Sequence, residues 1–236
     1  MIFTVKTQAR IDDFDRFGVM SPEAILHMLE DCACRHTALV DEGVIEKSRG
    51  GQAWILTEWS FRILRRPVSG EELTINTWTN GDPPAVTVWR ALEMLSHDGE
   101  PLVLAEANLA LLDRESGRLV RIMPEWFERY EPEERVLLPH EPKLRPPTAY
   151  QTQTTVQLRR ADLDFNGHLH NTRYFELAAE VLPEALERRA TSFRIAYRRA
   201  LGGSGAVSVR FAGDDTGGMV GIYDAQDTLC ALLRYA

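Results

Sequence analysis

The chain has 236 residues, and its 27 Lys and Arg against 35 Asp and Glu give a formal net charge of −8. With 44% hydrophobic and 26% charged residues, it is predicted to be a soluble globular protein of one large domain or two small ones. This composition excludes extensive disorder, and the apolar run 102–112, cut by Glu106, is shorter than the roughly 18 residues of a membrane span. The acidic balance argues against nucleic acid as the partner.

The cysteines and the N-terminal segment indicate a reducing compartment. Cys32, Cys34 and Cys230 form no disulfide framework. Cys32 and Cys34 do not suit a zinc knuckle, because residues two apart on a helix point to different faces. The first residues carry acids early and lack an apolar signal core, so we expect a cytoplasmic protein.

The first part of the chain is predicted to form a strand, a helix and then a run of strands. Residues 3–9 alternate as a strand does. Ser21 followed by Pro22 is typical of a capped helix start, and an apolar face follows from Ile25 to Ala33. Turn residues at 69–70, 80–84 and 97–101 then separate strands predicted at 53–66, 71–80, 85–96 and 102–113.

Proline marks the boundary between two halves. Residues 124–147 contain Pro124, Pro132, Pro139, Pro142, Pro146 and Pro147. We therefore predict a first unit over 1–123, a proline-rich, semi-extended linker over 124–150 and a second unit over 151–236.

The second part is predicted to repeat the same order of elements. A strand is indicated at 154–158, and a helix is expected after Asn171 as its cap, with apolar residues from Tyr174 to Val181. Further strands are predicted at 191–200, 205–212, 217–224 and 228–235.

Two sequence matches in the same order indicate an internal duplication. The segment 13–18 (DFDRFG) resembles 162–167 (DLDFNG), and 61–66 (FRILRR) matches 193–199 (FRIAYRR) with one inserted residue. The predicted fold class is α+β: two tandem units, each a long central helix wrapped by a curved antiparallel sheet. Such sheets leave free edges, which pairing of the two units would cover. A homodimer of the chain is a separate expectation.

The densest polar cluster lies in the loop before the second helix. Asp164, Asn166 and His168 place a carboxylate, an amide and an imidazole at two-residue spacing. Unpaired N–H groups at a helix N-terminus would stabilise the oxyanion of an ester or thioester held there. The carboxylate would act as a base toward water or attack directly, and both alternatives stay open. Walker, Gly-x-Ser-x-Gly and His-Glu-x-x-His motifs are absent from the sequence.

Comparison of the two copies of the repeat distinguishes residues that form the turn from candidate catalytic residues. The first copy keeps Asp15 and Gly18 but has Phe17 and Val19 where Asn166 and His168 stand. We therefore interpret the aspartates of the first copy and Asp162 as structural. Four histidines are interpreted in the same way: His27, His36, His97 and His140. His170 is interpreted as a surface residue next to the cap.

The segment 160–174 (RADLDFNGHLHNTRY) resembles the active-site segment of acyl-acyl carrier protein thioesterases of plants and bacteria, which are double hotdog enzymes. Other segments agree in kind: 26–36, 54–56, 65–67, 77–78 and 111–113. The resemblance implies hydrolysis of a fatty acyl thioester of acyl carrier protein, with the acyl chain held largely in the first unit. It implies that Asp164 is the catalytic carboxylate and that Asn166 and His168 position and polarise the thioester. No metal or organic cofactor is implied.

The chain departs from the plant family at one place. Tyr197-Arg-Arg199 is followed by Ala200 and Leu201, where the plant enzymes have a Glu-Cys pair. A cysteine nucleophile is therefore excluded there, and Glu176 is a candidate for a second acid. An acyl-CoA thioesterase and a non-catalytic acyl-binding hotdog protein remain alternatives. Docking an acidic carrier protein needs a local basic patch, for which the arginine pairs are candidates: 65–66, 159–160, 188–189 and 198–199.

Overall fold

The computed structural model describes residues 1–81, 86–203 and 205–236. The chain divides into two compact units, Met1–Pro139 and His140–Ala236. The turn predicted at 80–84, the start of the strand predicted at 85 and Ser204 in the turn at 202–205 lie partly or wholly outside the described residues. Within the described ranges, no helix is both long and apolar enough to cross a membrane.

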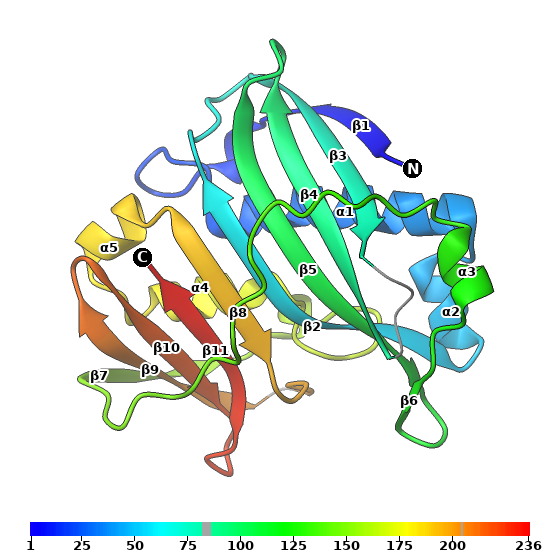
Figure 1. The fold of residues 1–236 in the computed structure, drawn as a ribbon. Helices are drawn as coiled ribbons and strands as arrows, with labels where there is room; N and C mark the ends of the chain where they lie inside the picture. The colour runs from blue at the N-terminus through cyan, green and yellow to red at the C-terminus, as the bar shows by residue number, and fades with distance from the viewer. Residues whose placement is uncertain (82–85, 204) are drawn as a thin grey trace. The chain divides into compact units, whose positions relative to one another are not determined.

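The first unit is an antiparallel sheet with a long helix on one face (Figure 1). Its strands follow the order β1-β3-β4-β5-β2, and β6 pairs with β5. The elements are β1 (Phe3–Gln8), α1 (Pro22–Val40), α2 (Val44–Arg49), β2 (Gln52–Ile63), β3 (Glu72–Asn80), β4 (Thr87–Ser96), β5 (Pro101–Asp113), β6 (Arg118–Val120) and α3 (Pro124–Glu128), with a 3-10 turn at Ile11–Asp13.

Helix α1 begins as its sequence predicts. The Ser21 side chain accepts the N–H of Ala24 at 3.1 Å, and Pro22 opens the first turn. The helix packs against β1, β3 and β4 through a buried stripe that runs on beyond the predicted apolar face: Ala24, Ile25, Leu26, Leu29, Cys32, His36 and Thr37.

The segment 124–139 belongs to the first unit, so its interpretation as a semi-extended linker is wrong for this part. Helix α3 lies inside it, and Phe127 and Tyr130 are buried. The indole N–H of Trp78 donates to the Arg135 carbonyl oxygen at 2.8 Å. Figure 1 shows the chain after α3 crossing the sheet on the face opposite α1. Buried aromatic side chains hold this proline-rich stretch on the sheet, which its composition alone does not reveal.

The second unit is a smaller antiparallel sheet in the order β8-β11-β10-β9-β7. Helix α4 packs against β9 and β10, and Phe175 on α4 makes edge-to-face contacts with Phe193 and Tyr235. The elements are β7 (Thr152–Gln157), a 3-10 turn (Arg160–Asp162), α4 (Arg173–Ala179), α5 (Glu184–Arg189), β8 (Ser192–Tyr197), β9 (Ala206–Asp214), β10 (Gly217–Tyr223) and β11 (Leu229–Tyr235).

The long helix predicted for the second unit is wrong. Two short helices, α4 and α5, take its place, and Pro183 lies between them. Proline cannot donate within a helix and disfavours helical backbone at the residue before it. Asn171 is not the cap either: the cap position is Thr172, and the carbonyl oxygen of Asn171 accepts the hydroxyl of Tyr197 at 2.8 Å.

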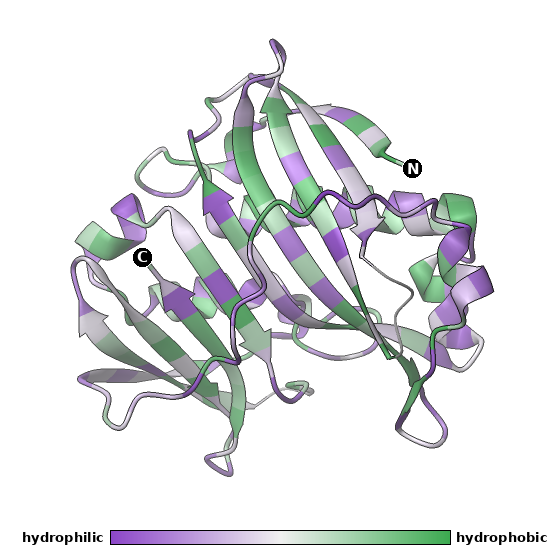
Figure 2. Cartoon of the chain, viewed as in Figure 1, coloured by the Kyte–Doolittle hydropathy of each residue, from purple (hydrophilic) through white to green (hydrophobic). Residues whose placement is uncertain are grey.

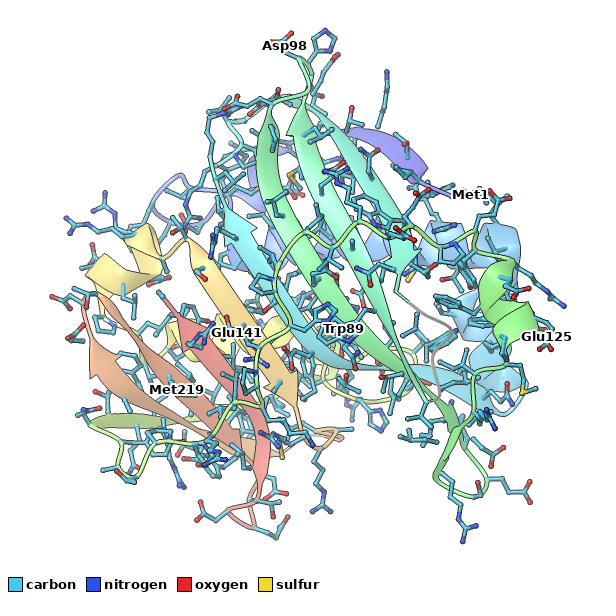
Figure 3. The ribbon with its side chains drawn as sticks, viewed as in Figure 1. Met1, Trp89, Asp98, Glu125, Glu141 and Met219 are labelled. Carbon is cyan, nitrogen blue, oxygen red and sulfur yellow. The ribbon has the colours of Figure 1, made fainter. Side chains whose placement is uncertain are left out.

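Strand positions follow the sequence closely because turns and alternation both mark them. In β1 and β9 alternate residues are more deeply buried, and Figure 2 shows hydrophilic and hydrophobic residues alternating along several strands. Turns end the strands where polar and glycine residues gather, and Figure 3 places Asp98 at the tip of the β4–β5 hairpin. The strand predicted at 191–200 ends at Tyr197, so Ala200 lies outside it.

The same pattern of backbone hydrogen bonds ends the matching strand in each unit, and it shifts the sequence alignment of the two units by one residue. The carbonyl oxygen of Leu102 accepts two successive N–H groups, the second from Arg65 at 3.3 Å. The carbonyl oxygen of Cys230 does the same, with Arg199 as the second donor at 3.1 Å. Arg65 therefore corresponds to Arg199, whereas the sequence match paired it with Arg198.

Candidate active site

The same loop is built in both units. In the first, the N–H of Asp15 donates to the Val19 carbonyl oxygen at 2.9 Å, and the N–H of Gly18 returns to the Asp15 carbonyl oxygen at 2.9 Å. Gly18 has a φ of +69°, a left-handed conformation that glycine adopts without a steric cost.

The loop of the second unit repeats each of these bonds. Asp164 N–H donates to the His168 carbonyl oxygen at 2.7 Å, and Gly167, at a φ of +76°, donates to the Asp164 carbonyl oxygen at 3.0 Å. In both loops a 3-10 turn precedes the aspartate and a helix follows. The sequence repeat therefore reflects one backbone design used twice.

In each loop, one carboxylate oxygen of the aspartate accepts two hydrogen bonds from backbone N–H groups of the same loop. Asp164 Oδ1 accepts the N–H of Asn166 at 2.8 Å and that of His168 at 3.0 Å. Asp15 Oδ1 accepts from Phe17 at 2.8 Å and from Val19 at 3.1 Å. Among the described residues, none donates to Asp164 Oδ2. In both loops, the two backbone N–H groups are therefore bound by Oδ1 of the aspartate.

The three residues singled out from the sequence all lie on this loop. Asp164 and Asn166 are half-buried and His168 is exposed. His168 pairs through its backbone with Gly202, and a Cβ built at Gly202 would lie 3.4 Å from His168 Cδ2. The residue before Gly202 also holds the loop, since the N–H of Leu169 donates to the Leu201 carbonyl oxygen at 2.7 Å.

Two tyrosines, Tyr174 and Tyr197, lie next to the residues that flank the loop. The sequence predicted Tyr174 only as part of the apolar face of the second helix. Tyr174 is buried and meets Tyr197 edge-to-face, with ring centroids 5.2 Å apart. Burial raises the pKa of the Tyr174 phenol, a hydrogen bond with the Leu201 backbone opposes this, and the charges of Cys230 and Asp164 add to it.

Asp162 holds the start of the loop, as its structural interpretation predicts, and His170, expected at the surface, is half-buried at the end of the loop. Asp162 accepts the Arg159 backbone N–H at 2.7 Å and its guanidinium Nη2 at 2.6 Å, and the Arg159 hydrogen bond is the main cause that lowers the pKa of Asp162. His170 N–H donates to the Asp162 carbonyl oxygen at 3.0 Å, and its ring lies 3.1 Å from the hydroxyl of Thr172.

The other expectations for this site need correction. Glu176 is exposed, and its carboxylate accepts a hydrogen bond from Arg173 at 2.6 Å. We therefore do not assign it the role of a second catalytic acid. Helix α4 has seven residues, and its first N–H, that of Arg173, donates to the His170 carbonyl oxygen at 3.0 Å. We therefore assign no oxyanion role to the start of this helix. Ala200 is exposed, two residues before Gly202.

No cluster of three or more His, Cys, Asp or Glu in the described part of the chain has the arrangement of a metal site. The three cysteines are free.

Comparison with solved structures shows that the two units form the hotdog fold. An acyl-ACP thioesterase from Bacteroides thetaiotaomicron matches with a TM-score of 0.88 at 18% identity, over 99% of this chain and 96% of that one. A 12:0-ACP thioesterase from Umbellularia californica matches with a TM-score of 0.84 at 16% identity, over 99% and 96%. The predicted α+β tandem hotdog architecture is confirmed.

Family models identify the family. The model for the acyl-ACP thioesterase N-terminal domain matches residues 1–130, and that for the C-terminal domain matches residues 146–213. The chain belongs to the acyl-ACP thioesterase family, as the resemblance of its loop segment implied.

Curated relatives are chloroplastic plant proteins of greater length. Oleoyl-acyl carrier protein thioesterase 2 of Arabidopsis thaliana is 24% identical over 182 residues, covering 70% of this chain and 49% of that protein. Palmitoyl-acyl carrier protein thioesterase of Cuphea hookeriana is 26% identical over 222 residues, covering 85% and 52%. The chain spans about half the length of the curated relatives it matches.

Proposed function

We propose that the protein hydrolyses fatty acyl thioesters, with acyl-acyl carrier protein as the preferred substrate, and releases the free fatty acid. One observation carries the site assignment. The loop backbone forms with Phe17 and Val19 in one unit and with Asn166 and His168 in the other, through the same hydrogen bonds. The loop therefore does not need the amide and imidazole, which leaves them a chemical role.

Asp164 is the proposed base. Its Oδ1 is held by two backbone N–H groups, which fixes the direction of Oδ2. Asp164 Oδ2 takes a proton from water as the water oxygen bonds to the thioester carbonyl carbon. The C–S bond then breaks, and the proton passes to the leaving thiolate.

Asn166 and His168 are the proposed positioning and polarising groups. Each carries an N–H donor that a phenylalanine or valine side chain lacks. Donors aimed at the carbonyl oxygen stabilise the negative charge that develops as water attacks. Because Phe17 and Val19 cannot do this, we propose one active site in each chain, on the loop of the second unit.

The carrier would dock on exposed arginines of the second unit. Several members of the arginine pairs already have structural partners: Arg65 is bonded to Glu71 at 2.6 Å, and Arg198 donates to the Leu144 carbonyl oxygen at 2.5 Å. Arg160, at the start of the loop, and Arg199, close after β8, are exposed. These two cations suit an acidic carrier protein.

A panel of three dodecanoyl thioesters, carried on acyl carrier protein, on coenzyme A and on uncharged N-acetylcysteamine, tests this proposal with purified protein. We expect the highest kcat/KM with the acyl carrier protein substrate. A preference for the coenzyme A substrate would assign the alternative carrier. Binding of all three without hydrolysis would assign a non-catalytic acyl-binding protein and contradict the proposal.

Two expectations from the sequence stay predictions. One is the homodimer of the chain, which sedimentation velocity would measure. A cytoplasmic location is predicted from the first residues and the cysteines, whereas the curated relatives are named chloroplastic.

A further inference from the structure

Phe165 is an apolar side chain at the surface of the candidate active-site loop. It is 56% exposed, whereas Asp164 and Asn166 on either side of it are half-buried. Among the described residues of the second unit, no other large hydrophobic side chain is exposed. Folding therefore buries such side chains throughout this unit and leaves one outside, directly between two residues of the proposed site.

The first loop shows that a phenylalanine is not needed at this position. Arg16 is its counterpart there, is also exposed, and has its guanidinium 4.5 Å from the centre of the Phe17 ring. Both loops close through the same backbone hydrogen bonds to their aspartates. The backbone of the loop thus accepts an arginine as readily as a phenylalanine, and neither a core contact nor loop closure accounts for Phe165.

The surface that continues from the same loop is built from glycines. The N–H of Gly203 donates to the Gly167 carbonyl oxygen at 3.5 Å, and Gly202 pairs through its backbone with His168. All three glycines are exposed, and a Cβ built at Gly167 or Gly203 would meet nothing within 4 Å. A ligand that lies here meets peptide groups directly, with one phenyl ring in the same loop.

The exposure of Phe165 indicates which part of a thioester it can contact. The reacting carbonyl carbon, placed at Asp164, carries an acyl chain on one side and the sulfur of the carrier on the other. The hydrocarbon of the acyl chain is stabilised by burial, whereas a carrier protein is too large to enter the unit. The arm that bears the sulfur must therefore run from Asp164 to the surface, where Phe165 lies and where exposed Arg160 suits an acidic carrier.

We propose that Phe165 is a specificity-determining residue that contacts the thiol-bearing arm of the carrier. Acyl carrier protein and coenzyme A share this pantetheine arm, which consists of amide groups joined by short hydrocarbon stretches. The phenyl ring packs against the hydrocarbon, and the exposed backbone at Gly167 and Gly203 suits the amides. The inference rests on the proposed thioester hydrolysis and assigns the binding of the substrate on its leaving-group side.

Two thioesters with the same acyl chain test the proposal: dodecanoyl-pantetheine and dodecanoyl-N-acetylcysteamine, which reproduces only the end of the arm. We expect Phe165→Ala and Phe165→Arg to raise the KM for the pantetheine thioester about fivefold to tenfold, the scale of burying half a phenyl ring. The kcat should stay the same, because this contact is equal in the ground state and the transition state. The KM for the N-acetylcysteamine thioester should not change.

Three other results would overturn the proposal. An equal rise of KM for both thioesters would place Phe165 against the acyl chain. A rise confined to dodecanoyl-acyl carrier protein, with the pantetheine thioester unaffected, would place it against the carrier protein itself. Unchanged KM values for all three substrates would mean that Phe165 contacts no part of them.

Further variants separate this contact from effects on folding and assembly. Phe165→Arg should keep the Tm of the wild type, because the first loop closes with an arginine at this position. Phe165→Leu retains an apolar side chain and should keep most of the affinity for the arm. Leu39→Ala removes another exposed apolar side chain, on α1, and should leave both KM values unchanged. A different sedimentation coefficient for Phe165→Arg would show that a second copy of the chain covers Phe165, which would overturn the proposal.

Failure of the proposed function can be distinguished from failure of this inference. If the wild type hydrolyses neither thioester, the proposed function is wrong, and calorimetry then gives the dissociation constants of the two intact thioesters. Weaker binding of only the pantetheine thioester by Phe165→Ala would still support the contact. Equal binding of that thioester by the wild type and Phe165→Ala would overturn it.

Discussion

Two hydrogen bonds join Asp164 to the backbone of His168. Asp164 Oδ1 accepts the N–H of His168 at 3.0 Å, and the N–H of Asp164 donates to the His168 carbonyl oxygen at 2.7 Å. Asp15 and Val19 make the same two bonds, at 3.1 and 2.9 Å. The imidazole takes no part in closing the loop, so its presence in one copy calls for a reason other than folding.

Asp15→Asn tests whether the first loop is structural. Asparagine keeps an oxygen that can accept from the backbone of Phe17 and Val19, so we expect nearly full turnover and at most a small loss of Tm. Asp15→Ala removes that acceptor and should cost about 1–3 kcal/mol of folding stability. Thermal unfolding and turnover of one acyl thioester measure both effects. A folded Asp15→Asn protein that loses catalysis as completely as Asp164→Asn would show that the two loops share a site.

Ala200→Glu tests the missing acid of the plant family. Ala200 is exposed and lies two residues before Gly202, whose backbone pairs with His168. A glutamate there should raise turnover by orienting water, and its charge should move the acidic limb of the pH–rate profile upward by disfavouring ionised Asp164. The profiles of the variant and the wild type are compared on one substrate. If the pH–rate profiles of the variant and the wild type have the same maximal rate and the same acidic limb, position 200 does not face Asp164.

Gly202→Val tests the placement of the His168 ring. A Cβ at Gly202 would already touch the ring at 3.4 Å, and the branched side chain of valine should displace it. We expect kcat to fall about tenfold or more, since small displacements of a positioning group are expensive. Gly205→Val is the matched control, because a Cβ there meets nothing within 4 Å. Equal kcat in the two variants would argue against a role for the ring position.

Glu141→Gln tests an ion pair that holds the second unit. Glu141, labelled in Figure 3, is bonded to Arg234 at 2.6 Å and to buried Arg194 at 3.4 Å. These arginines, Arg234 first, lower the pKa of Glu141, so its contribution to stability is present above the ordinary glutamate pKa and is lost as the pH falls through the lowered one.

We expect Glu141→Gln to lower the Tm by about 2–4 °C near neutral pH, from a loss of about 1 kcal/mol for a partly exposed pair. The difference should vanish in acid, where the wild-type carboxylate is protonated. Glu125→Gln, at an exposed position of α3, is the control and should leave the Tm unchanged at every pH. A Tm difference that is the same in acid and at neutral pH would contradict the ion-pair interpretation.

The strands could be predicted because two local signals agree on them. Alternation marks β1 and β9, and turn residues mark the ends of the hairpins. Helix α1 was predictable in the same way, through its Ser21 cap. The break before α5 was missed although Pro183 is visible in the sequence, because the apolar pattern from Tyr174 to Val181 suggested a longer helix.

The site could be predicted only in part. Asp164, Asn166 and His168 stood out because the first copy of the loop lacks two of them. Gly202 and Leu201 were not predictable as loop supports, because their contacts come from a segment more than thirty positions along the chain. Phe165 gave no signal either, because the sequence does not show which apolar residues of a loop pack inward, and its exposure becomes evident only in the folded chain.

The central claim is that Asp164 supplies the base, and turnover of dodecanoyl-acyl carrier protein by Asp164→Asn tests it most directly. Asparagine retains the Oδ1 acceptor for Asn166 and His168, so the loop should keep its shape while the base is lost. We predict a kcat at least about 100-fold below wild type, with an unchanged Tm, and a comparable loss in His168→Ala. Near wild-type turnover by correctly folded Asp164→Asn would contradict the account.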